Sequence, residues 1–190
     1  MKEFKIDKNT FIGGWYIDKK ICDEFIKYFN ENKVMHEKGT LSGNNLNTDI
    51  KESLDIYFYK KDFSNKIVYK YLTSLQDVLN NYLKKYPFAN NIHRFELSRF
   101  NMQYYKPKQG FKKFHCERQG LSVSTRCLVF MTYLNDVPDG GTVFKHQKIT
   151  TPAKKGLTLI WPTDWTHTHK GEISKKYEKY ILTGWYEFIE

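Results

Sequence analysis

Two residues that commonly bind metal ions, His115 and Glu117, stand two positions apart. In an extended segment, residues at this spacing point to the same side, so both side chains can reach one ion. Such a pair is common by chance and is weak evidence by itself. A second source of imidazole lies downstream in the segment 166–169, which reads Thr-His-Thr-His. The sequence therefore offers two histidines and one carboxylate to a metal ion.

Two imidazoles and one carboxylate on one face of iron(II) leave three coordination positions open. A keto acid can occupy two of these positions and dioxygen the third, so the metal supplies oxidising power and the protein supplies geometry and a dry pocket. The distal carboxylate of a buried keto acid needs a cation, because an unpaired buried charge is costly. Lys179 can supply it, because strand alternation places Lys179 on one face with Ile181, Thr183 and Trp185. Without the histidines, an exposed strand-edge lysine would be the better interpretation.

Over residues 94–190 the chain resembles the prolyl hydroxylase superfamily of 2-oxoglutarate dioxygenases. The family pattern is HxD or HxE, then a distal histidine, then a basic residue about ten positions later. Further matching features occur in order: Tyr105 ten residues before His115, Arg126 seven residues before Tyr133, the Tyr133-Leu134-Asn135 strand end, Gly140-Gly141, and Thr183-Gly184-Trp185. Together these features are specific, although each alone is not.

The resemblance implies that His115, Glu117 and His169 hold iron(II), and that no catalytic side chain is needed beyond these ligands. Strand parity alone does not choose between His167 and His169, and the family spacing to Lys179 favours His169. Glu117 stands where many members have Asp, and Lys179 stands where the oxygen-sensing branch has Arg.

The resemblance also assigns the cosubstrates, which are 2-oxoglutarate and dioxygen, with ascorbate as an additional cofactor. It implies that Lys179 pairs with the distal carboxylate of 2-oxoglutarate, and that Tyr105, Tyr133 and Thr183 help to hold this molecule. Arg126 could reach a substrate or form an ion pair with a nearby carboxylate.

Two amphipathic helices and several short strands must position these residues. Apolar residues spaced three and four apart predict helices over 17–33 and 64–85, with Asp18 near the start of the first and Pro87 ending the second. From Arg94 onward, β-branched and aromatic runs broken by Gly and Pro predict an antiparallel sheet with a turn over 136–141. The candidate strands are 95–105, 126–134, 142–148, 157–161 and 179–188.

The expected fold class is mainly β with supporting helices (α+β). The resemblance implies a double-stranded β-helix, a cupin-like jelly roll with N-terminal helices. A chain of 190 residues fits a single domain, 1–190. Within it, residues 1–93 form a supporting region of helices and strands, and residues 94–190 form the catalytic core.

Composition limits the class of protein. Apolar residues make up 40% and aromatic residues 17% of the chain, which is enough for a substantial core. Three cysteines without a CxxC pair argue against disulfides and thiolate zinc sites. No apolar stretch is long enough to span a membrane, and the first eight residues are too charged for a signal peptide. We therefore expect a soluble, intracellular, cytoplasmic protein that does not bind membranes.

The expected reaction is hydroxylation of a C–H bond, coupled to decarboxylation of 2-oxoglutarate to succinate. The resemblance alone indicates peptidyl proline in a protein or peptide substrate. One alternative is the same reaction on a free amino acid or small metabolite. A second is a non-catalytic basic binding module. The net charge of +10 is spread along the chain, so nucleic acid is not the expected partner.

Overall fold

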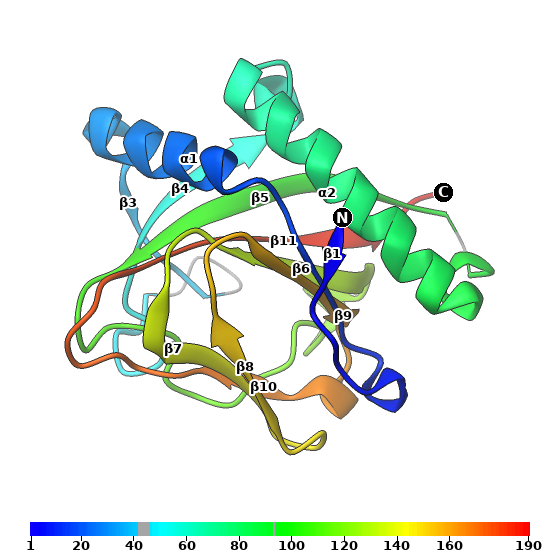
Figure 1. The fold of residues 1–190 in the computed structure, drawn as a ribbon. Coiled ribbons are helices and arrows are strands. Elements are labelled where there is room, and N and C mark those ends of the chain that lie inside the picture. Colours follow the sequence, from blue (N-terminus) through cyan, green and yellow to red (C-terminus); the bar gives the residue numbers. More distant parts are fainter. Residues whose placement is uncertain (42–45, 93) are drawn as a thin grey trace.

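The computed structural model describes residues 1–41, 46–92 and 94–190. In these residues, an eight-stranded antiparallel sheet lies across from a three-stranded antiparallel sheet (Figure 1). The large sheet has the order β1-β2-β9-β6-β11-β5-β4-β3, and the small sheet has the order β10-β7-β8. The strands are β1 (Lys2–Glu3), β2 (Gly13–Tyr16), β3 (Glu37–Lys38), β4 (Leu54–Tyr59), β5 (Phe95–Tyr105), β6 (Arg126–Tyr133), β7 (Val137–Phe144), β8 (Ile149–Ala153), β9 (Leu157–Pro162), β10 (His169–Gly171) and β11 (Lys179–Phe188).

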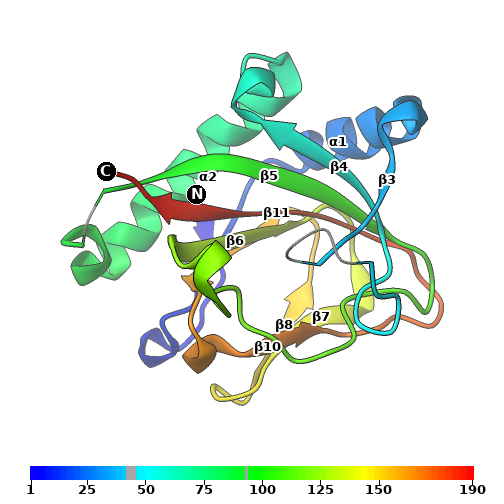
Figure 2. The same ribbon diagram turned by 180° about the vertical axis from the view of Figure 1, so that it is seen from behind.

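Both predicted helices form, and both lie on the same side of the large sheet (Figures 1 and 2). Helix α1 spans Lys19–Glu31 and α2 spans Lys66–Lys85. The Asp18 carboxylate caps α1 by accepting a hydrogen bond from the Lys20 amide, and Asn65 caps α2 in the same way. A capping side chain satisfies an amide that has no partner within the helix. Each helix therefore begins two residues later than the hydrophobic pattern predicts.

The apolar stripes of the helices form one core with the outer face of the large sheet. Tyr71 of α2 is completely buried, and its hydroxyl lies 2.9 Å from the Thr132 hydroxyl of β6. Thr132 in turn lies 2.8 Å from the Thr158 hydroxyl of β9. This buried chain of hydroxyls ties the helical layer to the middle of the sheet.

A second core fills the space between the two sheets. It contains Tyr133, Phe144, Trp161 and Ile181, which come from both sheets. Trp161 is 2% exposed. The nearby Trp165 is 69% exposed, because it lies beyond the end of β9 in a short 3-10 helix.

The strand predictions were correct for β5 and β11, within one residue for β6 and β9, and wrong for β7. Residues 136–141 were expected to form a turn, yet β7 already begins at Val137 and ends at Phe144. Only Val137 and Thr142 keep ladder partners across this stretch, so the residues between them form a bulge. Pro138 and the glycines are tolerated there because a bulge leaves backbone groups unpaired. The real turn follows Phe144, so the predicted strand 142–148 extends too far.

The two facing antiparallel sheets confirm the mainly β fold class with supporting helices, and the fold is the double-stranded β-helix. Strands β1 to β4 of the supporting region belong to the same sheet as β5 and β11 of the core. The boundary near residue 93 therefore crosses a continuous sheet, and the single-domain assignment stays a prediction. Within the described ranges, no helix is both long and apolar enough to cross a membrane.

Candidate active site

His115 and His169 are held side by side by their own backbones. The His115 amide donates to the His169 carbonyl at 2.9 Å, and the His169 amide donates to the His115 carbonyl at 2.8 Å. Directly opposite residues in such a bridge have neighbouring side chains. The two imidazole rings have centroids 4.5 Å apart, and Phe111 stacks on the outer ring, that of His115, at 3.6 Å.

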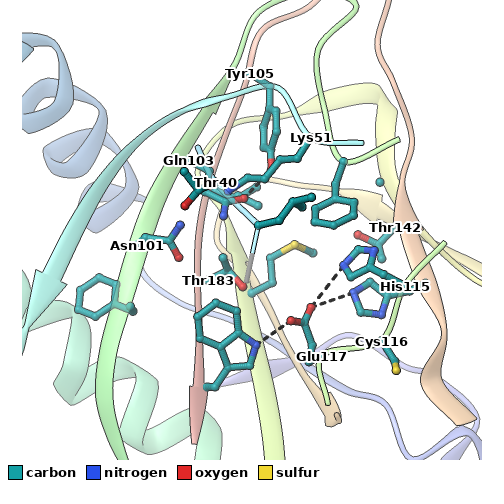
Figure 3. Close-up of a pocket in the computed structure, with 18 of the residues that line it drawn as sticks. Thr40, Lys51, Asn101, Gln103, Tyr105, His115, Cys116, Glu117, Thr142 and Thr183 are labelled. Carbon is teal, nitrogen blue, oxygen red and sulfur yellow. Dashed lines mark hydrogen bonds and ion pairs between the residues drawn. The ribbon is translucent and has the colours of Figure 1, made fainter. Parts of the chain in front are cut away.

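Glu117 completes this cluster. Its Oε1 atom lies 3.5 Å from His115 Nε2 and 3.4 Å from His169 Nε2 (Figure 3). The three donor atoms all lie within 4.8 Å of one another. Two imidazole nitrogens and one carboxylate oxygen form the donor set expected for a non-haem iron(II) site with open positions. The residues therefore fit the metal that the sequence predicts.

The second oxygen of Glu117 is fixed by groups outside the cluster. The Trp185 indole N–H donates to Oε2 at 2.8 Å, and the Arg126 guanidinium lies 3.7 Å from the same oxygen. Arg126 also stacks on the Trp185 ring at 3.6 Å from its centroid. The alternative in which Arg126 forms a structural ion pair is therefore observed. Such outer partners orient a ligating carboxylate and keep Oε1 turned toward the metal position.

Glu117 is ready to bind a cation at neutral pH. Burial alone would raise the pKa of its carboxyl, but hydrogen bonds and charge from His115 and His169 outweigh burial and hold this pKa well below the usual range. The carboxylate is therefore ionised, as metal coordination requires.

The other end of the site is centred on Lys179, the residue predicted to pair with the cosubstrate. Its ammonium group is buried and donates to two backbone carbonyls, those of Gly140 at 3.0 Å and Glu172 at 2.9 Å. No carboxylate of the described residues forms an ion pair with the Lys179 ammonium group. This group can therefore pair with the carboxylate of a bound molecule. Burial lowers the pKa of Lys179 to about 8, and the carboxylates of Glu172 and Asp139 oppose this shift.

Hydroxyl groups from both sheets lie near Lys179, with Tyr105 and Tyr133 on the large sheet and Thr142 on the small sheet. Tyr133 and Thr142 lie 2.6 Å apart through their hydroxyls, and the Tyr105 ring lies 5.5 Å from the ammonium nitrogen. Burial raises the pKa of Tyr133 to about 12 and that of Tyr105 well above its usual value, so both phenols stay protonated. A protonated phenol can donate one hydrogen bond, and in the structure the Tyr105 hydroxyl donates its proton to the Gln103 side-chain oxygen. Thr183 also lines this space, although its hydroxyl donates to the Phe130 carbonyl.

The metal-binding cluster and Lys179 line one cavity of about 750 Å³, which lies in the size range of small-molecule sites. Its far wall comes from β5, which carries Asn101 and Gln103, and from the segment just before β4, which carries Lys51 (Figure 3). Asp55, behind this wall, is completely buried and accepts hydrogen bonds from Lys51 at 2.7 Å and Asn101 at 3.1 Å.

The structure separates the two downstream histidines. His169 joins the cluster, whereas His167 is buried elsewhere, with Nε2 2.9 Å from the Thr10 carbonyl. The sequence did not reveal that Phe111 stacks on His115 or that Thr142 meets Tyr133. The spacing of these residues along the chain gives no signal for these contacts, because loop geometry and the bulge in β7 create them.

Comparisons with known proteins agree with this geometry. A double-stranded β-helix with two histidines and one carboxylate in its cavity defines the class of iron(II)- and 2-oxoglutarate-dependent oxygenases. Residues 100–187 match the sequence profile of the 2OG-Fe(II) oxygenase superfamily. This match confirms the resemblance seen in the sequence, and it supports iron(II) as the metal with 2-oxoglutarate and dioxygen as cosubstrates. No curated protein matches the sequence significantly.

Several solved structures share the fold. A viral collagen prolyl hydroxylase from Paramecium bursaria Chlorella virus-1, solved with 2OG, is 16% identical with a TM-score of 0.69, and the match covers 94% of this chain and 97% of that one. A Pseudomonas putida prolyl-4-hydroxylase is 11% identical with a TM-score of 0.69, covering 94% and 93%. A Trichoplax adhaerens prolyl hydroxylase, solved with a hypoxia inducible factor oxygen degradation domain peptide, is 12% identical with a TM-score of 0.71, covering 92% and 83%.

Proposed function

We propose that this oxygenase hydroxylates proline residues in a peptide or protein, with His115, Glu117 and His169 as the iron ligands. The observation that carries the proposal is the metal-binding cluster beside the buried Lys179 in one cavity. The structurally similar prolyl hydroxylases support the choice of substrate. In the overall reaction, the substrate, dioxygen and 2-oxoglutarate yield the hydroxylated substrate, succinate and carbon dioxide.

The protein's own residues bind and orient the reactants. When bound, iron(II) supplies the redox chemistry that activates dioxygen. Lys179 holds the distal carboxylate of 2-oxoglutarate by a charge-assisted hydrogen bond, and Tyr133 donates a second bond to the same group. Trp185 and Arg126 keep Glu117 in one orientation. The buried apolar residues Met131, Trp161 and Ile181 limit the entry of water.

The decisive experiment follows two products at once. Purified protein is supplied with iron(II), 2-oxoglutarate, oxygen and a proline-containing peptide, and succinate and peptide mass are measured. We expect succinate in proportion to peptide that has gained one oxygen atom, and no product with Glu117→Ala. An identical peptide with alanine in place of proline is the control. Equal oxidation of both peptides would contradict the choice of proline.

The small-metabolite alternative is tested in the same assay with free proline and other free amino acids. The cavity has room beyond the keto acid, and its outer rim carries the exposed residues Glu37, Tyr59 and Arg99. An open rim of this kind suits a segment of a longer chain. Oxidation of a free amino acid in preference to every peptide would favour the alternative.

A further inference from the structure

At one edge of the active-site cavity, two lysines next to the cavity lining share a single aromatic ring. Phe114 lines the cavity and is 41% exposed. The Lys170 nitrogen lies 4.8 Å and the Lys145 nitrogen 5.5 Å from the centre of its ring. Both distances lie within the reach of cation–π attraction. We call Phe114, Lys145 and Lys170 the lysine–phenylalanine patch.

The strands that carry the metal ligands also build this patch. Because His115 lies opposite His169, the preceding Phe114 comes opposite Lys170. Lys170 pairs with Val143 of β7, and the Lys145 amide donates to the Thr168 carbonyl at 2.9 Å. Lys170 of β10 therefore projects to the face opposite to the inward-pointing His169, and Lys145 lies in the turn that directly follows the neighbouring strand β7. The patch is fixed in place relative to the metal-binding cluster.

The charge of the patch is not balanced within the chain. Lys27, Lys60 and Lys112 each form an ion pair with a glutamate, as do several other lysines. In the part of the chain that the structure describes, neither Lys145 nor Lys170 forms one. Two cations held over one ring repel each other, so an anion that binds there gains attraction from both.

Other charges around the cavity are neutralised or have a role. Lys51 pairs with Asp55, Arg126 pairs with Glu117, and Lys179 is assigned to the keto acid. On the opposite rim, Glu37 and Arg99 carry opposite charges. Next to the cavity, the lysine–phenylalanine patch is therefore the place where two cations lie close together without an ion-pair partner among the described residues.

We propose that this patch recognises acidic residues that flank the hydroxylated residue of a peptide substrate. The inference rests on the proposed function, because a peptide that enters the cavity to reach His115 passes the adjacent Phe114. Carboxylates would pair with Lys145 and Lys170, and an apolar neighbour would pack on the Phe114 ring. A peptide is favoured over nucleic acid because the patch is small and borders the active-site cavity.

The test uses three heptapeptides with the same central Gly-Pro-Gly, flanked on each side by two glutamates, two glutamines or two lysines. Binding is measured by fluorescence anisotropy on the metal-free protein, and turnover is measured separately as succinate formed. We expect the glutamate peptide to bind on the order of tenfold more tightly than the glutamine peptide at low salt, with the difference lost at high salt. The lysine peptide should bind most weakly.

The key variant is Lys145→Glu/Lys170→Glu, with Lys145→Gln/Lys170→Gln as a milder change. The matched control is Lys20→Glu/Lys66→Glu, which makes the same change in net charge at two exposed lysines in the first turns of α1 and α2. The patch variants should lose the preference for glutamate, while the KM for 2-oxoglutarate and the binding of the glutamine peptide stay unchanged. The control should keep the preference.

Three results would overturn the inference. They are equal binding of the glutamate and glutamine peptides to the unmodified protein, an equal loss in the patch and control variants, or patch-dependent binding of single-stranded RNA that excludes the peptide. Failure of the proposed function gives a different result. In that case the glutamate peptide would bind through the patch, yet no peptide would be oxidised or would increase succinate formation.

Discussion

At the scale of single residues, the candidate metal ligands lie apart from Lys179, the residue proposed to bind the cosubstrate. The three metal-binding side chains meet at one end of the cavity, and Lys179 is buried at the other, held by the carbonyls of Gly140 and Glu172. A substitution at Lys179 should therefore affect 2-oxoglutarate without removing the metal. This separation makes the role of each residue testable by itself.

Lys179→Ala is expected to raise the KM for 2-oxoglutarate on the order of tenfold to a few hundredfold, because a charge-assisted pair is lost. Iron affinity, measured by titration of the metal-free protein, should stay nearly constant. Burial lowers the pKa of Lys179 to about 8, so the free protein carries a protonated ammonium below that pH and loses it above. The KM for 2-oxoglutarate should rise as the pH passes 8. An unchanged KM in Lys179→Ala would assign the cation role to another residue.

The two downstream histidines give a second residue-scale prediction. His169→Ala should remove iron and abolish turnover, because its Nε2 is one of the three clustered donor atoms. His167→Ala should keep iron, because His167 Nε2 lies against the Thr10 carbonyl, and it should lose stability through the broken buried hydrogen bond, about 1–3 kcal/mol. Measurements of metal content and of urea unfolding on both variants decide which histidine is the metal ligand. Full iron in His169→Ala and none in His167→Ala would reverse the assignment.

The three candidate metal ligands could be proposed from the sequence because residues two apart in an extended segment point to the same side. The partners of these residues could not be predicted. Trp185 reaches Glu117 across 68 positions in the chain, and Glu117 lies in an irregular segment between β5 and β6. Phe111 stacks on His115 through an irregular loop. Irregular backbone has no period that a sequence pattern could reveal.

At the scale of elements, one short segment ties the wall of the cavity to the loop that carries His115. The Glu52 backbone amide donates to the Gly110 carbonyl, and the Lys112 backbone amide donates to the Ile50 carbonyl. Between them, Lys51 inserts its ammonium group beside Asp55 at 2.7 Å, with both side chains almost fully buried. The buried ion pair therefore helps to hold Phe111, and through it His115, in place.

Asp55→Ala should lower the free energy of unfolding by about 3–5 kcal/mol, because Lys51 would stay buried without its counter-charge. The double variant Lys51→Met/Asp55→Leu should recover most of this loss, because no buried charge remains. Urea unfolding measures both. A loss in Asp55→Ala of less than about 1 kcal/mol, the value for an exposed pair, would mean that water reaches Lys51.

Element prediction from the sequence succeeded where the pattern was periodic. The helices and the long strands β5 and β11 alternate or repeat regularly, and their predicted ranges were correct or nearly so. Strand β7 was read as a turn because Pro138, Gly140 and Gly141 are typical turn residues. In the structure Gly141 approaches the Thr151 carbonyl so closely that a Cβ atom would lie 2.1 Å away. Residue 141 must therefore be glycine because of close packing. The local sequence does not distinguish this requirement from the need for glycine in a turn.

At the scale of the whole molecule, the supporting region and the catalytic core share their interior. The order of strands places β4, from the N-terminal half, directly beside β5, and β2 beside β9. The sequence predicted the helices as a supporting layer, but it could not predict that N-terminal strands extend the catalytic sheet, because strand order depends on contacts between distant segments. The two regions therefore depend on each other for burial of their apolar surfaces.

This shared interior predicts that the chain unfolds in one cooperative step. Helix content followed by far-UV circular dichroism and the environment of Trp161 followed by fluorescence should give the same urea midpoint. Tyr71→Phe removes the hydrogen bond between α2 and Thr132 of the sheet, and it should shift both midpoints together, by about 1 kcal/mol of unfolding free energy. Loss of the helix signal at clearly lower urea than the fluorescence change would contradict the prediction. That result would mean that residues 1–93 form a unit that separates from an intact sheet, which the continuous ladder from β5 to β4 argues against.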